Sequence, residues 1–141
     1  MNTKIQNIFL IIFLCILSSS LRYPLIEQSS IWLDEAWRIN ASQMPLNSNI
    51  TILANQLMSY EGLLRLAGHL IGSDEWSYRI PSNLSGIFSV PALFYLGLIL
   101  TKNQKISFIA AVLLALNPWH ITYSIEAASY SIGSFLVVLL F

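Results

Sequence analysis

The sequence predicts an all-α polytopic membrane protein with about four transmembrane helices, the last of them truncated, and a long amphipathic-helical first outer loop. The 141 residues are 55% hydrophobic and only 10% charged, whereas a soluble domain carries about 25% charged residues. The apolar residues gather in uncharged runs, several of them long enough to cross a hydrocarbon core of about 30 Å. Seven basic and seven acidic residues balance, so the composition predicts no binding of nucleic acid, which requires a basic surface.

Four runs without Asp, Glu, Lys or Arg are the predicted spans, at residues 5–21, 80–101, 106–125 and 127–141. The first could instead be a secretory signal peptide, but no small-x-small cleavage site follows it, so we expect an uncleaved helix. Pro91 lies in the middle of the second run, where a membrane helix tolerates a kink. The last run ends without a polar flank, so we expect the N-terminal piece of a longer protein or a truncated gene product.

Lysines indicate the cytoplasmic side. Lys4, Lys102 and Lys105 fall on one side of the predicted topology, without any acid, and short lysine-rich segments are typical of the cytoplasmic face. We therefore predict a multi-pass protein of the cytoplasmic membrane with its N-terminus inside and residues 22–79 as an outer loop. An aromatic belt at the outer interface then comprises Trp32, Trp37, Trp76 and Trp119.

The outer loop opens with "SSIWLDEAWRIN", residues 29–40. Ser29 or Ser30 can cap a helix here, and the acids Asp34 and Glu35 would then suit the positive end of its macrodipole. We expect this helix to lie along the membrane surface. A second helix is predicted over about 50–71, because leucines recur at helical spacing and a glycine follows.

Asp34 and Glu35 are the first candidates for chemistry. The simpler interpretation is a capped, solvated helix start. Between interfacial tryptophans, however, a carboxylate can have a raised pKa and act as a base. Arg79 lies where the loop re-enters the membrane; it can be a snorkelling anchor or bind a phosphate through its planar fork. The residues alone leave both alternatives open.

A third cluster lies around the outer end of the third run, where we expect Pro118 to break the helix. His120, Tyr123 and Glu126 are spaced three apart, so one helical face can present them, and Tyr130 follows. Glu126 is the only charged residue after Lys105, and acids at the membrane are functional candidates by default. Histidine and carboxylates leave a divalent metal open, although two histidines and scattered acids are a weak pattern.

Four motifs carry a resemblance to a known family: "LRYP" followed by "IWLDEA", "LIGSDEWSYRIPSNLSGIFSVPALFYLG", "IAAVLLALNPWHITYS" and "YSIEAASY". Together they cover most of the chain. It resembles the N-terminal part of bacterial polytopic glycosyltransferases of the C-type fold, which are related to protein O-mannosyltransferases and to the aminoarabinose transferases of lipid A.

The resemblance implies transfer of a sugar from a polyprenyl-phosphate donor to a protein, lipid or glycan acceptor on the outer side of the membrane. It implies that Asp34, with Glu35 beside it, is the catalytic base or the residue that orients the acceptor, and that Arg79 lies near the lipid phosphate. The side chains expected to contribute to substrate binding are Arg79, Tyr123, Glu126, Tyr130 and His120. Some relatives use a divalent ion, so the cofactor stays unknown, with a divalent metal as one option.

The chain departs from the family pattern at two positions of the last motif. Ala128 replaces an arginine and Ile125 a glutamine, and the usual prolines before the second loop helix are absent. These departures favour an alternative: a non-catalytic membrane subunit, a carrier-lipid binder or a transporter-like scaffold. For an enzyme, we expect the 141 residues alone to be inactive, and we expect Asp34 to face a cavity near Arg79 and Glu126, with the tryptophans of residues 32 and 37 toward the membrane.

Overall fold

The computed structural model describes residues 3–26, 30–47 and 50–141, and this part of the chain is helical and contains no strand. Its elements are α1 (Thr3–Arg22), the 3-10 turn η1 (Tyr23–Leu25), α2 (Leu33–Gln43), α3 (Ile50–Met58), α4 (Tyr60–Leu70), α5 (Glu75–Thr101), α6 (Gln104–Ala115), α7 (Pro118–Ser124) and α8 (Tyr130–Leu140). The predicted all-α class is confirmed.

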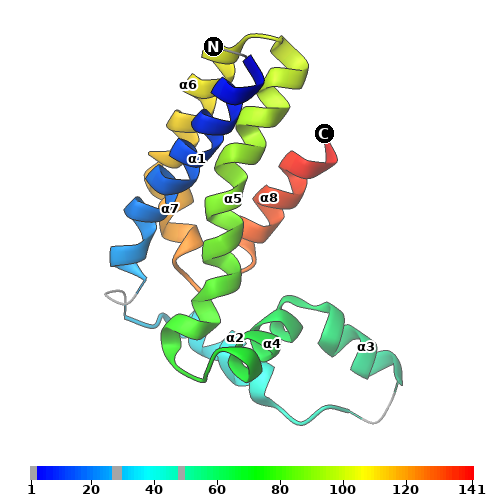
Figure 1. The fold of residues 1–141 in the computed structure, drawn as a ribbon. Helices are drawn as coiled ribbons and strands as arrows, with labels where there is room; N and C mark the ends of the chain where they lie inside the picture. The colour runs from blue at the N-terminus through cyan, green and yellow to red at the C-terminus, as the bar shows by residue number, and fades with distance from the viewer. Residues whose placement is uncertain (1–2, 27–29, 48–49) are drawn as a thin grey trace.

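The helices form two layers (Figure 1). The long helices α1 and α5 run beside α6. Helices α2, α3 and α4 gather beside the N-terminal end of α5, which lies far from the N-terminus of the chain. Two apolar helices are long enough to cross a membrane, Lys4–Leu25 and Glu75–Thr101. The pair α6 and α7 makes a third only if a bend of 59° falls within one span. Membrane association is therefore supported by two or three candidate spans.

The predicted span over 106–125 is interrupted at Asn117 and Pro118, as expected from the proline. Proline has no N–H to donate and disfavours helix at the residue before it, and Asn117 has an extended backbone. The Asn117 side chain then accepts a hydrogen bond from the backbone N–H of His120 at 3.2 Å, which caps the new helix α7. The sequence therefore ends one helix and begins another at this point.

Helix α5 begins at Glu75 and continues into the predicted span without a break, so Pro81 lies inside it. The helix also continues through Pro91. Its inner face carries small residues that allow close packing. A Cβ atom on Gly86 would lie 2.3 Å from the Cβ of Ser124, so α5 and α7 approach each other more closely than any larger residue at position 86 would allow.

The outer-loop helices differ from their predicted bounds. The helix predicted over 50–71 is divided at Ser59, which has an extended backbone and is the N-cap of α4. Gly72 follows α4 with a φ of +145°, a conformation that favours glycine. Helix α2 has Trp32 rather than a serine at its N-cap; of the two predicted caps, Ser30 precedes it and Ser29 lies outside the described residues.

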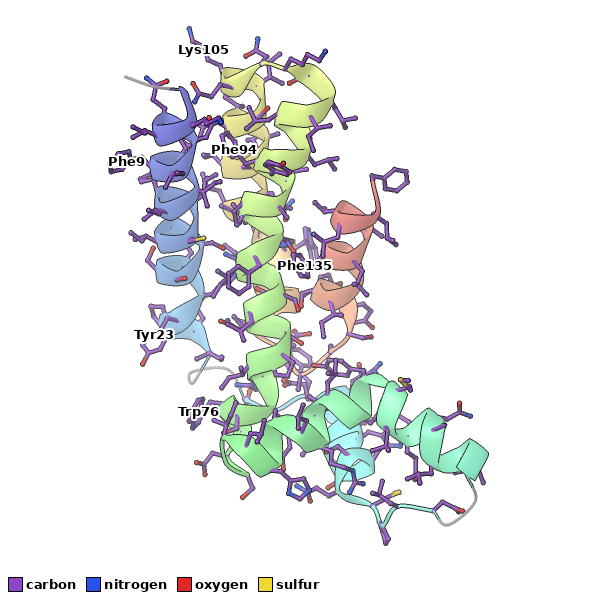
Figure 2. All side chains as sticks on the ribbon, turned by 45° about the vertical axis from the view of Figure 1, so that its right-hand side comes forward. Phe9, Tyr23, Trp76, Phe94, Lys105 and Phe135 are labelled. Carbon is purple, nitrogen blue, oxygen red and sulfur yellow. The ribbon has the colours of Figure 1, made fainter. Side chains whose placement is uncertain are left out.

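Two apolar clusters hold the layers together. The first lies between α1, α5 and α6 and consists of Leu14, Val90, Phe94, Ala111 and Ala115; Figure 2 labels Phe94 among the long helices. The second joins α4, α5 and the turn before α8 through Leu64, Tyr78 and Ala127. Burying such side chains contributes roughly 1.5–3 kcal/mol for each large one.

The predicted cytoplasmic residues share one end of the molecule. The side-chain amide of Gln104 donates to Asn7 Oδ1 at 2.7 Å, which joins the start of α6 to the first turns of α1. Lys105 is at this end, whereas Tyr23 and Trp76 lie toward the opposite end, beside the α2–α4 layer (Figure 2). The separation of the lysines from the outer-loop layer agrees with the predicted topology, while the side of the membrane stays a prediction.

Candidate functional site

A buried ion pair joins the outer-loop layer to the long helices. Arg79 of α5 and Glu35 of α2 are 1% and 2% exposed. Arg79 Nε donates to Glu35 Oε1 at 3.0 Å and Nη2 donates to Oε2 at 3.1 Å, while Nη1 donates to the carbonyl of Ile26 at 2.7 Å. The planar guanidinium thus uses both carboxylate oxygens, which is the geometry that arginine favours with carboxylates.

The same carboxylate holds the backbone around it. Glu35 Oε1 also accepts the N–H of Ala127 at 2.6 Å, and Oε2 accepts the N–H of Trp32 at 3.2 Å. The second contact satisfies a free donor at the start of α2. Glu35 therefore ties together α2, α5 and the turn between α7 and α8.

That turn has a second attachment beside the first. Ser82 of α5 donates its hydroxyl to the carbonyl of Ala128 at 2.7 Å. The hydroxyl of Tyr60, 2.7 Å away, then donates to Ser82 Oγ, and burial raises the pKa of the Tyr60 phenol, which keeps its proton in place. Ala128 is only 2% exposed, so an arginine at this position would need a different arrangement of the turn.

This geometry changes the roles expected of two predicted site residues, Arg79 and Glu35. Arg79 is not a snorkelling anchor, because its guanidinium is buried against Glu35 instead of reaching toward water. Glu35 accepts four hydrogen bonds, so in this arrangement its lone pairs are committed to protein donors. Breaking a buried pair by removing one partner costs about 3–5 kcal/mol, so the pair is above all a structural tie.

Asp34, the adjacent residue, has the opposite environment. Its side chain is 60% exposed, and its nearest cation is Arg38, one helical turn away at 3.7 Å. Asp34 also lines a surface hollow of about 600 Å³ with Trp32, Leu33 and Trp37. We expected the tryptophans to point away from the acid. Instead the acid and both tryptophans border the same hollow, and it is Glu35, not Asp34, that contacts Arg79.

Glu126 lies in the turn that Glu35 holds. Burial raises the pKa of its carboxyl, and the negative charges of Glu35 and Asp34 raise it further, while Arg79 opposes them. The structure thus brings all three acids into one electrostatic neighbourhood around the end of α5. Among them, Asp34 and Glu126 have no ion-pair contact with Arg79.

Sequence reasoning missed a second buried arginine, Arg22, at the end of α1. It is 0% exposed, and its Nε donates to Ser124 Oγ at 2.8 Å. Nη1 donates to the carbonyl and the hydroxyl of Ser18 at 2.9 and 2.7 Å, and Nη2 lies 2.6 Å from His120 Nδ1. No carboxylate of the described residues lies within ion-pair distance of Arg22.

The contact with Arg22 assigns the protons of His120. A guanidinium can only donate, so His120 Nδ1 accepts and the ring proton resides on Nε2. A protonated nitrogen is not a metal ligand, and over the described ranges no three His, Cys, Asp or Glu side chains are grouped as a metal site requires. The structure therefore supplies no support for the divalent ion that the sequence left open.

The predicted substrate-binding tyrosines lie beside His120. The rings of Trp119 and Tyr123 stack with centroids 6.0 Å apart, and Tyr123 and Tyr130 are 4.9 Å apart. These rings lie on α7 and at the start of α8, so His120 and the tyrosines form one group while Glu35 and Arg79 form another. The sequence spacing could suggest the first group. Of the partners of Arg22, however, His120 and Ser124 are 98 and 102 residues distant, and they leave no local signal.

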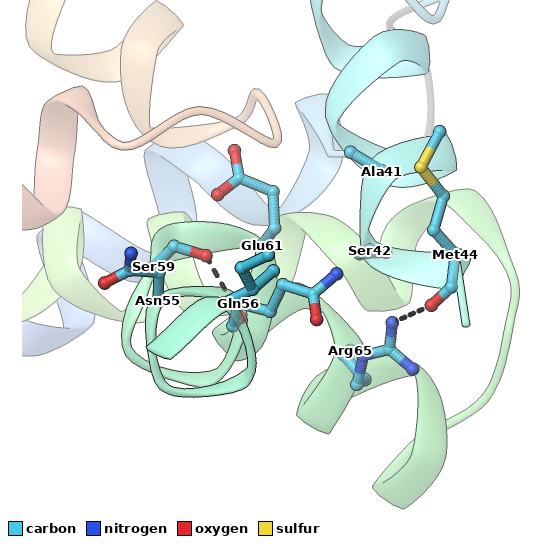
Figure 3. A pocket seen from close by; sticks show the side chains of 9 residues that line it. Ala41, Ser42, Met44, Asn55, Gln56, Ser59, Glu61 and Arg65 are labelled. Carbon is cyan, nitrogen blue, oxygen red and sulfur yellow. Dashed lines mark hydrogen bonds between the residues drawn. The ribbon is translucent and has the colours of Figure 1, made fainter. Parts of the chain in front are cut away.

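A further cavity of about 330 Å³ lies within the outer-loop layer, away from both groups (Figure 3). Arg65 donates to the carbonyl of Met44 at its edge, and Ser59 donates to the carbonyl of Gln56. None of the predicted site residues lines this cavity. It results from the break between α3 and α4, which the sequence did not predict.

Comparison with known proteins gives no relative for this arrangement. No family model matches the chain, and neither the characterised proteins nor the solved structures contain a match.

Proposed function

We propose that this chain belongs to a membrane-embedded transferase that moves a sugar from a polyprenyl-phosphate donor to an acceptor at the outer face of the membrane. The proposal rests on the sequence motifs together with one structural observation. Two adjacent acids of α2 have separate environments: Glu35 is buried in an ion pair, and Asp34 is exposed in a hollow bordered by tryptophans. This difference favours a structural role for Glu35 and a direct role in the reaction for Asp34.

In this proposal Asp34 accepts the proton of the attacking hydroxyl. The hydroxyl oxygen bonds to the sugar's anomeric carbon while the bond from that carbon to the phosphate oxygen breaks, so the carrier leaves as a phosphate anion. A carboxylate within reach of the hydroxyl lowers the barrier to such an attack by taking its proton, and a cation stabilises the leaving anion. Exposure matters, because only an accessible carboxylate can meet both substrates.

The cation beside Asp34 is Arg38 rather than Arg79. Arg38 lies between Asp34 and Glu61, at 3.7 and 3.6 Å, and faces the ring of Tyr60 at 6.0 Å. Its Nε is buried and has no hydrogen-bond acceptor within the described part of the chain. We therefore assign to Arg38 the phosphate contact that the motif assigned to Arg79, and to Arg79 the positioning of α2 through Glu35.

A non-catalytic role is the second candidate, as a membrane subunit or a carrier-lipid binder. The closure of the Glu35–Arg79 centre favours it, because the motif arginine and one motif acid are both occupied by protein partners. The burial of Ala128 and Ile125 favours it as well, because these positions offer no polar group where the family pattern has arginine and glutamine.

A substitution at Asp34 separates the two candidates. In native membranes that contain the protein, Asp34→Asn should reduce sugar transfer from a labelled polyprenyl-phosphate donor by about 100-fold or more, since the proton acceptor is removed. Asp74→Asn is the matched control: Asp74 is an exposed carboxylate at the start of α5 and makes no side-chain capping bond.

The amount of each variant in the membrane is measured alongside, by quantitative immunoblotting. Because the 141 residues alone are expected to be inactive, the test uses membranes in which the wild type shows transfer. Transfer that is unchanged in Asp34→Asn membranes with equal protein rejects the catalytic assignment and favours the non-catalytic role.

A further inference from the structure

Arg65 of α4 carries a charge that its protein neighbours do not neutralise. Its Nη2 atom donates to the carbonyl of Met44 (Figure 3), but no carboxylate of the described residues lies within ion-pair distance of its guanidinium. Glu61, one helical turn earlier, pairs with Arg38 instead, at 3.6 Å. The cation of Arg65 is therefore open to an anion from outside the chain.

The remaining donors of Arg65 are accessible. Nε and Nη1 have no hydrogen-bond acceptor among the described residues, and neither atom is enclosed by the protein. The residue is only partly buried. A ligand can thus meet these two nitrogens without any rearrangement of α4.

Arg65 borders a hollow of about 550 Å³ between the end of α2, helix α4 and the start of α5. This volume is typical of a small-molecule pocket, which measures about 300–1,000 Å³. None of the described residues that line the hollow is acidic. The lining residues that matter for binding are Gln43, Arg65, Gly68, His69, Ser73 and Tyr78.

Helix α4 places a second nitrogen base beside the arginine. His69 lies one helical turn after Arg65, so both residues share a face, and its side chain is exposed. Gly68 leaves room there for Tyr78, since a Cβ atom at residue 68 would lie 2.9 Å from Tyr78 Oη. The same hydroxyl oxygen accepts from Gln43 Nε2 at 3.0 Å. These contacts hold α2, α4 and α5 together around the hollow.

The lining groups match the chemistry of a phosphate monoester. The guanidinium of Arg65, the imidazole of His69 and the hydroxyl of Ser73 can all donate hydrogen bonds. A phosphate monoester carries a charge of about −1.5 to −2 at pH 7 and offers three acceptor oxygens, so it can accept from several of these groups at once. A carboxylate offers two oxygens, and a neutral sugar has no charge to balance Arg65.

We propose that this hollow is a binding site for a phosphate monoester, with Arg65 as its principal contact and His69 and Ser73 as further donors. The inference does not depend on the proposed sugar transfer, because Asp34 and Arg38 do not line the hollow.

The first test removes the principal contact. The purified full chain in an uncharged detergent is titrated with glycerol 3-phosphate, and binding is measured by isothermal titration calorimetry. Arg65→Gln should weaken binding about tenfold or more, because charge-assisted hydrogen bonds are lost. Lys105→Gln, the control, removes an equal charge at the opposite end of the molecule and should leave binding unchanged. A wild type that does not bind, or equal losses in the two variants, overturns the proposal.

A second pair of variants leaves the bond between Arg65 and Met44 in place. His69→Glu puts a negative charge into the hollow and should weaken binding about tenfold or more through repulsion. Leu70→Glu adds the same charge at the next residue, which is 75% exposed and does not line the hollow, and it should bind nearly as the wild type does. Helical circular dichroism checks that both variants fold. Equal affinities of the two variants place the ligand elsewhere and refute the site.

Competition experiments define the anion and its source. Acetate at equal concentration should not displace glycerol 3-phosphate, and displacement would contradict the assignment to phosphate. Dioctanoyl phosphatidic acid presents the same monoester on a lipid. If it binds more tightly than glycerol 3-phosphate and this binding is lost in Arg65→Gln, the site holds a lipid headgroup; equal or weaker binding that is likewise lost in Arg65→Gln identifies a soluble phosphate ester.

Discussion

The protein buries two arginines at the ends of its long helices, and their surroundings differ in one respect. Arg79 has a carboxylate partner that pairs with its guanidinium through two hydrogen bonds. Arg22 is equally buried, but among the described residues its guanidinium hydrogen-bonds only to Ser18, Ser124 and His120, all neutral in this arrangement. One centre is electrically closed, and the other retains a positive charge.

This difference predicts a structural role for Arg79 but not for Arg22. A closed pair in a low-dielectric interior depends on both partners, because removal of either leaves an uncompensated charge. A buried cation with neutral partners is itself the uncompensated group, so its removal relieves a desolvation cost. The fold is therefore expected to depend strongly on Arg79 and little on Arg22, although both side chains are fully enclosed.

The largest expected effect comes from breaking the closed pair. Arg79→Met should lower the free energy of unfolding by about 3–5 kcal/mol, because Glu35 stays buried without its partner. Arg22→Met should change it by no more than about 1 kcal/mol. Unfolding in mixed detergent micelles, followed by helical circular dichroism, measures both.

The double variant Glu35→Met with Arg79→Met is the control for this comparison. Apolar replacement of a whole buried pair is often neutral, so the double variant should recover most of the stability that Arg79→Met loses. If Arg22→Met is as damaging as Arg79→Met, charge compensation does not explain the difference between the two centres.

An intermediate effect is expected at the close contact beside Arg22. Gly86→Ala places a Cβ atom 2.3 Å from that of Ser124, whose hydroxyl accepts from Arg22 Nε. Overpacking of this kind costs about 1–3 kcal/mol. Adding Ser124→Gly removes the opposing atom and should restore most of the loss in the same unfolding measurement. A stability of Gly86→Ala equal to that of the wild type would show that α5 and α7 are not in tight contact.

The smallest expected effect concerns the charge of Glu126, which lies beside the Glu35–Arg79 pair. The pKa of Glu126 is raised on folding, so the folded state binds its proton more tightly than the unfolded state does. Stability from this group is present below the ordinary pKa of 4.5 and decreases as the pH rises through the folded pKa. Glu126→Gln should therefore be slightly more stable than the wild type at neutral pH, by less than about 1 kcal/mol, with a flatter pH profile above 4.5.

Unfolding of both proteins across that pH range gives the comparison. A wild-type stability that rises relative to the variant with increasing pH contradicts the assigned sign.

Part of the fold could be predicted because its signals are local. The apolar runs specify α1 and most of α5, since a length of uncharged sequence is enough to identify a candidate span. The break at Pro118 was predicted, because a proline is a local signal. The break at Ser59 was missed, because it appears only where α3 and α4 diverge around a cavity.

The candidate site was predictable by residue type more than by role. Asp34, Glu35 and Arg79 were identified as a group, and the structure does bring Glu35 and Arg79 together. Which acid would pair could not be read from adjacent positions, because neighbours on a helix point about 100° apart and only the packing of α2 decides which one faces α5. Arg22 looked like an ordinary helix end because two of its partners, His120 and Ser124, are distant in the chain.

By itself, then, the sequence determined the helical class, the candidate spans and the presence of acids and an arginine at one level of the membrane. Hydrophobicity and helical period are properties of neighbouring residues, so they can be determined without knowledge of the fold. The tertiary structure alone decided that Glu35 is enclosed, that Asp34 is exposed, and that Arg22 is buried against Ser18, Ser124 and His120. Burial and pairing depend on which helices meet, and that is set by packing across the whole chain.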